Sequence, residues 1–399
     1  MPEGVSPDEP VPGNRPEVSL ATIAREWGRI GCTGFGGPPT HIAMLRRLAV
    51  QREGWLDEAE FEDAIAAVNL LPGPASTQLA IFCAWRLRGV AGALIGGACF
   101  ICPGLGLIIV LAAVFLAGHP PTWISGAALG AGAAVAAVAV NAAIGLVPAS
   151  WRRTDGARAR QVRWVVYAVV GGAAAATVGA FLVLVLLGCG LAEALLSGTA
   201  RPPQRLHGVL FPFFGVVVAV VGGLGALTWV ALKVGALSFG GGFVIIPLMQ
   251  SDAVHHYHWM TNAQFLNGVA LGQITPGPVV QTVSVVGYAA GGLGGALLAA
   301  LVAFLPSFAF VIAGARHFGA LRTNRFAQSF LSGAGPAAIG AIAGASIPLA
   351  LGIAHVWQVF VLVGASGAII GLRRSVVLTL VCAGVVGAVG AALGLPIGG

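Results

Sequence analysis

Uninterrupted apolar runs of about 25 residues recur along this chain, for example over residues 91–117, 123–147 and 165–192. Because lipid offers no hydrogen-bond partners, a backbone that crosses it must bond to itself, in helices or in a closed barrel. Roughly 20 apolar residues in a helix cross a hydrocarbon core ~30 Å thick. Barrel strands are only about ten residues long and alternate polar with apolar positions. We therefore predict an all-α integral membrane protein.

The composition agrees with a lipid environment. Hydrophobic residues make up 57% of the 399 residues and charged residues only 9%. At roughly 20 residues per span plus loops, the chain has room for about 10 to 12 transmembrane helices. The formal net charge of +7 comes from arginine clusters between the apolar runs, which is typical of loop anchors and not of a nucleic-acid-binding surface. The expected partner is the lipid bilayer, and no nucleic acid is expected.

Residues 1–17 are rich in proline and acidic residues and lack a basic stretch followed by an apolar one. They do not resemble a signal peptide, and we expect a disordered cytoplasmic tail. The six cysteines lie almost all in apolar segments, so neither a disulfide framework nor a metal site is predicted. No cofactor is predicted either. Cys99 and Cys102 form a CxxC pair, which keeps an intramembrane reductase open as an alternative.

A four-residue motif occurs twice. GFGG at residues 34–37 recurs as SFGG at residues 238–241, which is 204 positions further on. The same shift relates Trp55 to Trp259, and it relates the first Pro-Gly-Pro tripeptide to the second. A register that holds over this length indicates a duplicated membrane fold.

These matches divide the chain into two repeats. We predict a first repeat over residues 18–192, a connecting segment over 193–219 and a second repeat over 220–399. The first repeat has five predicted segments, over 18–38, 62–86, 89–117, 123–148 and 164–192. The second repeat has a counterpart of each and an additional span near 375–396.

Loop arginines give the predicted orientation. Cytoplasmic loops are enriched in Lys and Arg, and residues 149–163 contain five arginines, so this loop is placed inside. The corresponding loops of the second repeat change sides, as inverted-topology repeats require, and the N-terminus is cytoplasmic. By this count Arg46, Arg47 and Arg52 fall outside. Either the first segment does not fully span the membrane, or these arginines line a water-filled vestibule.

Each repeat interrupts its apolar sequence with Pro-Gly-Pro. A proline in a helix interior removes a backbone donor, but it is tolerated in the first turn, so helices are expected to begin near Pro74 and Pro278. The first turn of a helix has unpaired amide groups and a partial positive charge, which bind anions. Two such half-helices would surround a tetrahedral oxyanion with donors. Taken alone, each tripeptide is also compatible with a plain kink between spans.

The residues around these breaks form the predicted substrate site. Their hydroxyl and amide groups add donors without a permanent charge, which suits weak, reversible binding of a dianion. In the first repeat they are Asn69, Pro72, Gly73, Pro74, Ser76, Thr77 and Gln78, and in the second Gln273, Thr275, Pro276, Gly277, Pro278, Gln281 and Thr282.

A second group is predicted to take part in gating or coupling. Glycine permits unusual backbone conformations, histidine titrates near neutral pH, and intramembrane charges often mark ion pathways. The plainer interpretations are close helix packing, a structural histidine, and acids that favour a helix N-terminus. The group is Gly36, Gly37, His41, Arg46, Glu62, Asp63, Gly240 and Gly241. The run of His255, His256 and His258 is expected to be a solvated loop, not a metal site.

These motifs resemble the chromate ion transporter family in its two-domain form. The similarity lies in GFGGP at residues 34–38, HIA at 41–43, LLPGP and STQLA within 70–80, and TPGP at 275–278. It covers nearly the whole chain beyond the N-terminal tail. One departure is Asn267, where the family pattern has aspartate.

The resemblance implies a function. Members of this family are expected to be secondary active transporters, not enzymes, that export chromate across the bacterial inner membrane and confer chromate resistance. A carrier for sulfate or another anion is the alternative. Coupling to a proton or to a counter-anion, and assembly as a homodimer, both stay open. For alternating access we expect one half to rock against the other about a central site.

Overall fold

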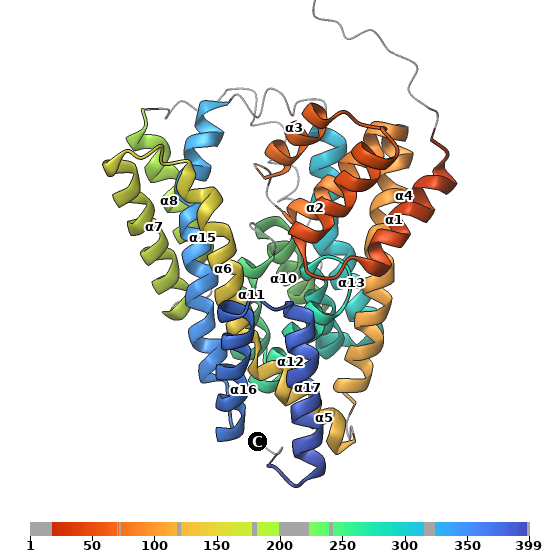
Figure 1. Ribbon diagram of the computed structural model, residues 1–399, viewed down its shortest axis with the longest axis vertical. Helices are drawn as coiled ribbons and strands as arrows, with labels where there is room; N and C mark the ends of the chain where they lie inside the picture. The colour runs from red at the N-terminus through yellow and green to blue at the C-terminus, as the bar shows by residue number, and fades with distance from the viewer. Residues whose placement is uncertain are drawn as a thin grey trace, which may run out of the picture.

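The computed structural model of the chain describes residues 18–69, 71, 73–117, 121–177, 182–198, 223–238, 242–314 and 324–396. These residues form helices joined by short connections, and no strand occurs among them (Figure 1). The all-α prediction is confirmed. The N-terminal tail and most of the predicted connecting segment lie outside the described residues.

The helices fall into two series, one for each repeat. The first is α1 (Leu20–Thr33), α2 (Pro38–Arg46), the π-helical η1 (Arg47–Arg52), α3 (Glu58–Val68), α4 (Ala75–Phe115), α5 (Thr122–Ala133), α6 (Val135–Arg152), α7 (Arg158–Thr177) and α8 (Leu182–Leu196). The second is α10 (Gly223–Leu237), η5 (Phe243–Ile245), α11 (Ile246–Gln250), η6 (Ser251–His256), α12 (Asn262–Ile274), η7 (Val279–Gln281), α13 (Thr282–Gly314), α15 (Arg325–Leu351), α16 (Val356–Ser366), η9 (Gly367–Gly371) and α17 (Val376–Ala392).

α4 and α13 each consist of two helical stretches that reverse direction. The backbone leaves the helical region at Arg88 and Gly89 in α4, and at Gly291 and Gly292 in α13. A methyl group on Gly287 would overlap the carbonyl oxygen of residue 295, although eight residues of a straight helix span about 12 Å. Each element therefore consists of a short half-helix that follows Pro-Gly-Pro and a long apolar helix that runs back beside it. The reversal in α4 falls at the predicted boundary between segments 62–86 and 89–117.

α1 is too short to cross a membrane. Its 14 residues are about 21 Å long, against a hydrocarbon core of ~30 Å. It packs against α4, where the indole of Trp27 donates a hydrogen bond of 2.8 Å to the carbonyl of Ala80. Of the two explanations for the misplaced arginines, the structure favours a first segment that does not span.

Ion pairs show where these arginines lie. Arg46 pairs with Glu58 at 2.8 Å and also with Glu62, while Arg86 pairs with Glu60. All three carboxylates belong to α3, so the arginines that precede α3 lie at the same end of the molecule as the loop with Arg86. The alternation count places them on the opposite side because it treats the first segment as a complete span.

Helix packing repeats with the same shift as the sequence. A methyl group on Gly31 would press against the carbonyl oxygens of Cys99 and Phe100, and one on Gly235 would overlap that of Ala303. The π-helical turns η1 and η6 also differ by 204 positions. The duplication therefore extends to packing contacts. The opposite orientation of the repeats stays a prediction.

The segment predicted over residues 164–192 is two helices. α7 ends at Thr177 and α8 begins at Leu182. The two are joined by Arg163, which donates hydrogen bonds of 2.7 and 3.0 Å to Glu193. The single-span prediction is wrong because the residues between the helices are apolar and give no turn signal. α17 then corresponds to α8 and is not an additional span.

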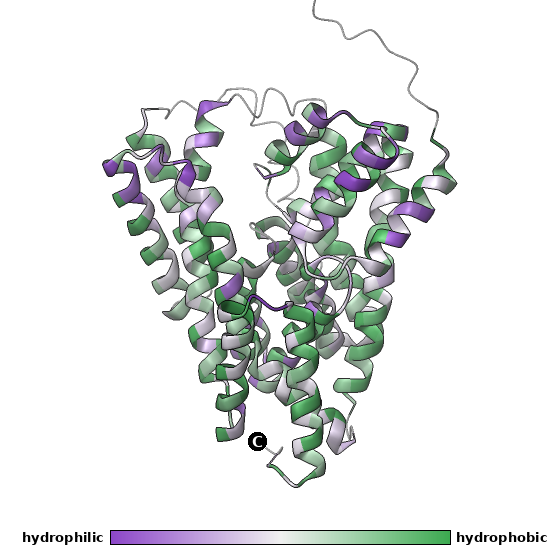
Figure 2. Ribbon diagram, viewed as in Figure 1, coloured by the Kyte–Doolittle hydropathy of each residue, from purple (hydrophilic) through white to green (hydrophobic). Residues whose placement is uncertain are grey.

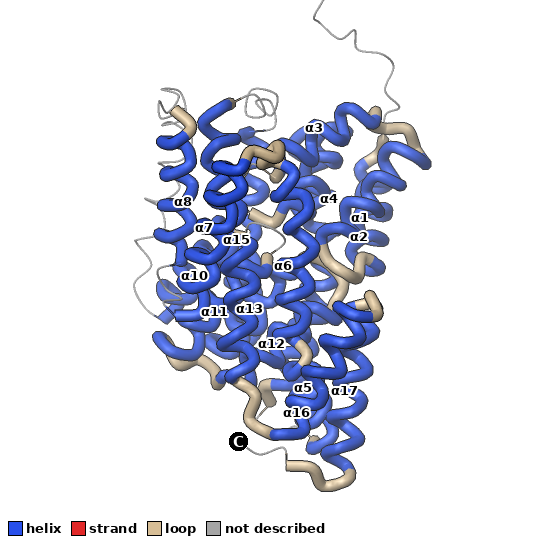
Figure 3. The backbone as a smooth tube through the Cα atoms, turned by 60° about the vertical axis from the view of Figure 1, so that its left-hand side comes forward, coloured by secondary structure: helices blue, strands red, loops and turns tan. Residues whose placement is uncertain are grey.

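The two repeats interlock in two bundles. The site bundle comprises α1–α4 and α10–α13, in which α4 packs on α13. The frame bundle comprises α5–α8 and α15–α17, in which α15 packs on α7 and α8, and α17 on α5. Figures 1 and 3 both show α7, α8 and α15 together, away from α1 and α4. Rocking one repeat against the other would separate the close-packed helices of both bundles. Which parts move during transport stays a prediction.

The outer surface suits lipid. In the part of the chain that the structure describes, four helical stretches are long and apolar enough to cross a membrane. Large apolar side chains point outward, such as Val169 and Leu184, each 64% exposed. Figure 2 shows apolar residues along the helices and hydrophilic residues gathered at the end where α3 lies. The number of spans, 10 to 12, stays a prediction. The four stretches are Ala75–Phe115, Thr122–Arg152, Val279–Gly314 and Arg325–Leu351.

Candidate functional site

Both half-helices begin directly after Pro-Gly-Pro. The first starts at Ala75, with Pro74 as its N-cap, and the second at Val279, with Pro278 as its N-cap. The central glycines have φ of +122° and +97°, which L side chains rarely adopt. The predicted helix starts are confirmed, and the sharp turn before each depends on glycine.

A chain of hydrogen bonds joins the two turns. Gly277 of the second turn donates its N–H to the carbonyl oxygen of Gly34 at 3.0 Å. The same oxygen lies 2.8 Å from Nε2 of His41, and Nδ1 of His41 lies 3.4 Å from the hydroxyl of Ser76 in the first half-helix. The carbonyl oxygen of Gly34 therefore joins the two repeats where their half-helices begin, and His41 links this oxygen to the first half-helix.

The partners of His41 fix its tautomer. A carbonyl can only accept, so Nε2 carries the proton and Nδ1 accepts from Ser76. The ring is fully buried and meets Phe100 edge-on at 5.0 Å between centroids. It lies in α2, which has nine residues and is too short to span. Burial lowers the pKa of His41, which favours the neutral ring that this network requires.

The first turn packs against the long helix of the other repeat. A methyl group on Gly73 would lie 2.5 Å from Nε2 of Gln78 and 3.2 Å from the hydroxyl of Ser307. Ser307 belongs to α13 and is fully buried. The first half-helix start therefore faces a hydroxyl from the second repeat.

The second turn makes the reciprocal contact with α4. A methyl group on Gly104 would overlap the carbonyl oxygen of Pro276 and lie 2.6 Å from Oε1 of Gln281. The amide of Gln281 also donates to the carbonyl of Ile101 at 2.8 Å. Each Pro-Gly-Pro turn is thus held by the other repeat, at positions close to the prolines of those long helices, Pro306 and Pro103.

Several buried polar atoms near these turns have no hydrogen-bond partner. Leaving such an atom unpaired costs about 1–3 kcal/mol, and native proteins keep few of them without a functional reason. A ligand with matching donors and acceptors would satisfy them. They are Thr77 Oγ1, Gln273 Nε2, Gln281 Oε1, Ser284 Oγ and Ser307 Oγ.

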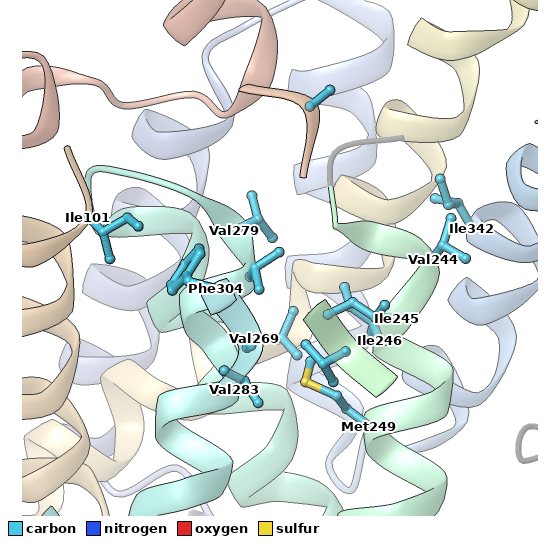
Figure 4. Packing of buried hydrophobic residues seen from close by; sticks show 14 of the residues in the cluster. Ile101, Val244, Ile245, Ile246, Met249, Val269, Val279, Val283, Phe304 and Ile342 are labelled. Carbon is cyan, nitrogen blue, oxygen red and sulfur yellow. The ribbon is translucent and has the colours of Figure 1, made fainter. Parts of the chain in front are cut away.

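Apolar side chains enclose the second half-helix. Figure 4 shows Val279 at its start beside Phe304 of α13, and Val244 of η5 beside Ile342 of α15. Polar contacts are stronger in such low-dielectric surroundings, and unpaired polar groups cost more. The site therefore combines a few polar groups with a dry environment.

Known proteins match the chain along both repeats. The family model described as chromate transporter matches residues 21–194 and 225–388. The chain belongs to the chromate transporter family. The chromate transport protein of Cupriavidus metallidurans is 31% identical over 84% of this chain and 84% of its own length. That of Pseudomonas aeruginosa is 31% identical over 84% and 82%. No solved structure gives a significant match.

As a member of the chromate transporter family, the chain is a multi-pass membrane protein, and its named relatives are transporters, not enzymes. An uncharacterized transporter of Methanocaldococcus jannaschii is also similar, at 26% identity over 79% of this chain and 81% of its own length. The matched ranges include both Pro-Gly-Pro turns. Both turns therefore lie in the part of the chain that resembles the family.

Some predicted substrate-site residues serve the helices instead. The amide of Asn69 is exposed and donates to the carbonyl of Ile65 at 2.8 Å. The hydroxyl of Thr275 donates to Leu271, at 2.9 Å, and that of Thr282 donates to the carbonyl of residue 279, at 2.8 Å. These three side chains complete helix ends. Pro72, Gly240 and Gly241 lie outside the described residues.

The charged residues predicted to take part in coupling also have a structural role. Arg46 and Glu62 form the ion pair described above, and Asp63 lies beside Glu62 on α3. The ion pairs of Arg46 hold α2 against α3. A pair that sequence reasoning missed joins η1 to α1: Arg52 lies 2.7 Å from Glu26 and holds the pKa of that carboxyl below its usual range.

Of the two predicted gating glycines of the first repeat, Gly36 borders a cavity. Gly36 and Gly37 have φ of +102° and +75°, and Gly37 is the N-cap of α2. A cavity of about 600 Å³ lies between Phe35, Gly36 and Thr40 and the first turns of α17. The three histidines of the predicted solvated loop are exposed: His255, His256 and His258. No cluster of three metal-ligating side chains occurs in the described part of the chain.

The departure at Asn267 lies outside the two turns. Its Oδ1 is buried without a partner and would meet a methyl group on Gly132 at 2.8 Å. The residue therefore faces α5 of the frame bundle across the interface between the bundles. An aspartate there would place a charge in this interface.

Sequence reasoning also missed Ser307 and Gly104. Both follow a proline in a long apolar helix, and Pro103 and Ser307 are 204 positions apart. The shift that related the two tripeptides therefore also relates the segments that hold them. Extending the comparison to these segments would have shown that they correspond, but not that they contact the turns.

Proposed function

We propose that this member of the chromate transporter family is a secondary active transporter that exports chromate from the bacterial cytoplasm across the inner membrane, with its N-terminus inside. The bridge of hydrogen bonds from Ser76 through His41 and Gly34 to Gly277 carries the proposal, because it sets two half-helix starts beside unpaired polar atoms. Two of the relatives described above are chromate transport proteins. Export of this kind would confer chromate resistance.

The substrate would lie between the two half-helix starts. The hydroxyls of Thr77 and Ser307 and the amide of Gln273 supply donors that no protein group uses. The half-helix N-termini add partial positive charge. Because these side chains are buried, entry and release require a movement that opens the site to one side at a time. Coupling to a proton or to a counter-anion would drive the export.

Flux into everted membrane vesicles tests this function. We expect energised vesicles that contain the protein to accumulate chromate, whereas vesicles that are not energised do not. Thr77→Val removes one hydroxyl at nearly constant volume, so chromate flux should fall about five- to tenfold, as expected for a lost hydrogen bond of about 1–1.5 kcal/mol. Membrane abundance should be unchanged.

Thr177→Val is the matched control. Thr177 is exposed at the end of α7, and its hydroxyl donates to the carbonyl of Ala173 in its own helix at 2.7 Å. Its flux should equal that of the wild type. Well-folded protein with no chromate flux would contradict the proposed cargo, and flux of sulfate in its place would support the alternative carrier.

A further inference from the structure

The amide of Gln281 has a fixed orientation. Its Nε2 donates to the carbonyl oxygen of Ile101 at 2.8 Å. Since a carbonyl oxygen cannot donate, the amide cannot be flipped. Oε1 is left buried and without a partner, next to Gly104 and Gly277. Among the five unpaired side-chain atoms named above, Gln281 Oε1 is therefore the one that can only accept a hydrogen bond.

The corresponding position of the first repeat differs. Thr77 lies 204 positions before Gln281 and also has an unpaired buried oxygen. A hydroxyl can donate or accept, so Thr77 and Ser307 can both serve an ionised oxygen of the ligand, and so can the amide nitrogen of Gln273. Only Gln281 Oε1 cannot, because its lone pairs would face those of the anion.

The charge of the site residues is a second, independent argument for a protonated anion. The side chains placed at the two turns are neutral: Ser76, Thr77, Gln273, Gln281 and Ser307, together with the neutral ring of His41. Moving an ion out of water into a medium of low dielectric is costly without a counter-charge. In the Born description this cost grows with the square of the ionic charge. A monoanion therefore fits these surroundings better than a dianion.

We propose that the site takes oxyanions in their singly charged, protonated form, and that the O–H group of the bound anion donates to Oε1 of Gln281. The inference rests on the proposed function, since it concerns the substrate of the same site. For chromate the bound species is hydrogen chromate, and the other oxygens receive the hydroxyl and amide donors. A fully ionised oxyanion of the same shape leaves the acceptor unpaired and facing a negative oxygen.

Competition against chromate flux in proteoliposomes of the full-length wild-type protein tests the proposal at one neutral pH. Phosphate and arsenate keep an O–H group at neutral pH, whereas sulfate and molybdate do not. We expect phosphate and arsenate to inhibit chromate flux at concentrations about tenfold or more below those at which sulfate and molybdate inhibit it. The reason is that a site built to bond an O–H group rejects analogues without one. Sulfate and molybdate competing as well as arsenate would overturn the proposal.

Two variants identify the atom responsible. Gln281→Met removes the acceptor at similar volume. The inhibitory potency of sulfate, divided by that of arsenate, should then rise toward one. Ser307→Ala removes a donor, so all four anions should weaken together and the ratio should stay as in the wild type. A Gln281→Met protein that keeps the wild-type ratio would overturn the assignment. The wild-type competition decides the proposal by itself if that variant does not fold.

Failure of this inference differs from failure of the proposed function. If folded protein moves no chromate in proteoliposomes, the cargo is wrong. If it moves chromate but sulfate competes as well as arsenate, the cargo stands and the selection for a protonated anion is wrong.

Discussion

Gly104 is the residue where α4 touches the second Pro-Gly-Pro turn. A methyl group there would overlap the carbonyl oxygen of Pro276, which is backbone and cannot rotate away. We expect Gly104→Ala to push the turn out of place, at a cost of about 1–3 kcal/mol. Chromate flux should fall sharply, and the thermal midpoint of the purified protein should decrease.

Gly106→Ala is the control for that substitution. Gly106 lies on the same helix, is exposed, and a methyl group there would meet nothing within 4 Å. Alanine is the better helix former by about 1 kcal/mol, so this protein should be as stable as the wild type or more stable. Equal flux in both variants would contradict a tight contact at Gly104.

At the residue scale, the sequence predicts the part of the site that depends on local chemistry. Pro-Gly-Pro predicts the helix starts, and thus the positions of Thr77 and Gln281 in their first turns. It does not predict the carbonyl of Gly34, or Ser307, as neighbours of these turns. Those contacts depend on packing between segments more than 200 positions apart, which has no local signal.

At the element scale, the reversal inside α13 depends on Gly292. This residue has φ +59° and ψ −150°, and a methyl group there would meet nothing within 4 Å. Any cost of Gly292→Ala is therefore conformational strain, of about 1–3 kcal/mol. We expect a lower thermal midpoint and a lower flux, because the half-helix no longer folds back correctly on the long helix.

Gly294→Ala separates strain from other effects. Gly294 also has open space around it but lies in the helical stretch after the reversal, so alanine should be neutral or stabilising. The two thermal midpoints, measured in the same detergent, give the comparison. Similar midpoints would show that the backbone at Gly292 is not strained by a side chain.

A helix end marked by polar residues or proline is predicted well from the sequence. A helix end inside a continuous apolar stretch is not. The reversal in α4 coincides with Arg88 and Gly89, which interrupt an apolar sequence. The break between α7 and α8 has no such signal, so hydrophobicity alone merges the two helices. For α1 the sequence leaves two explanations open, because its charged residues, such as Arg25 and Arg29, fit a segment that does not span as well as one that lines a vestibule.

At the scale of the whole molecule, the sequence repeat and the structural unit differ. Duplication indicates two halves, and a moving half is the natural expectation for a duplicated carrier. Each bundle, however, contains helices of both repeats in close contact, such as α4 with α13 and α15 with α7. The movement that leaves both cores intact is one of the site bundle against the frame bundle.

Two disulfides distinguish these movements in a protein whose native cysteines are replaced. A Cβ atom at Gly132 of α5 would lie 3.4 Å from that of Leu266 in α12, which joins frame to site bundle. One at Gly384 of α17 would lie 3.9 Å from that of Ala131, within the frame bundle. Both separations are near the ~3.8 Å of a disulfide, and both pairs join the two repeats.

If the bundles move, oxidation should stop chromate flux only in the Gly132→Cys, Leu266→Cys protein, and reduction should restore it. If the repeats move as rigid halves, both disulfides should stop it.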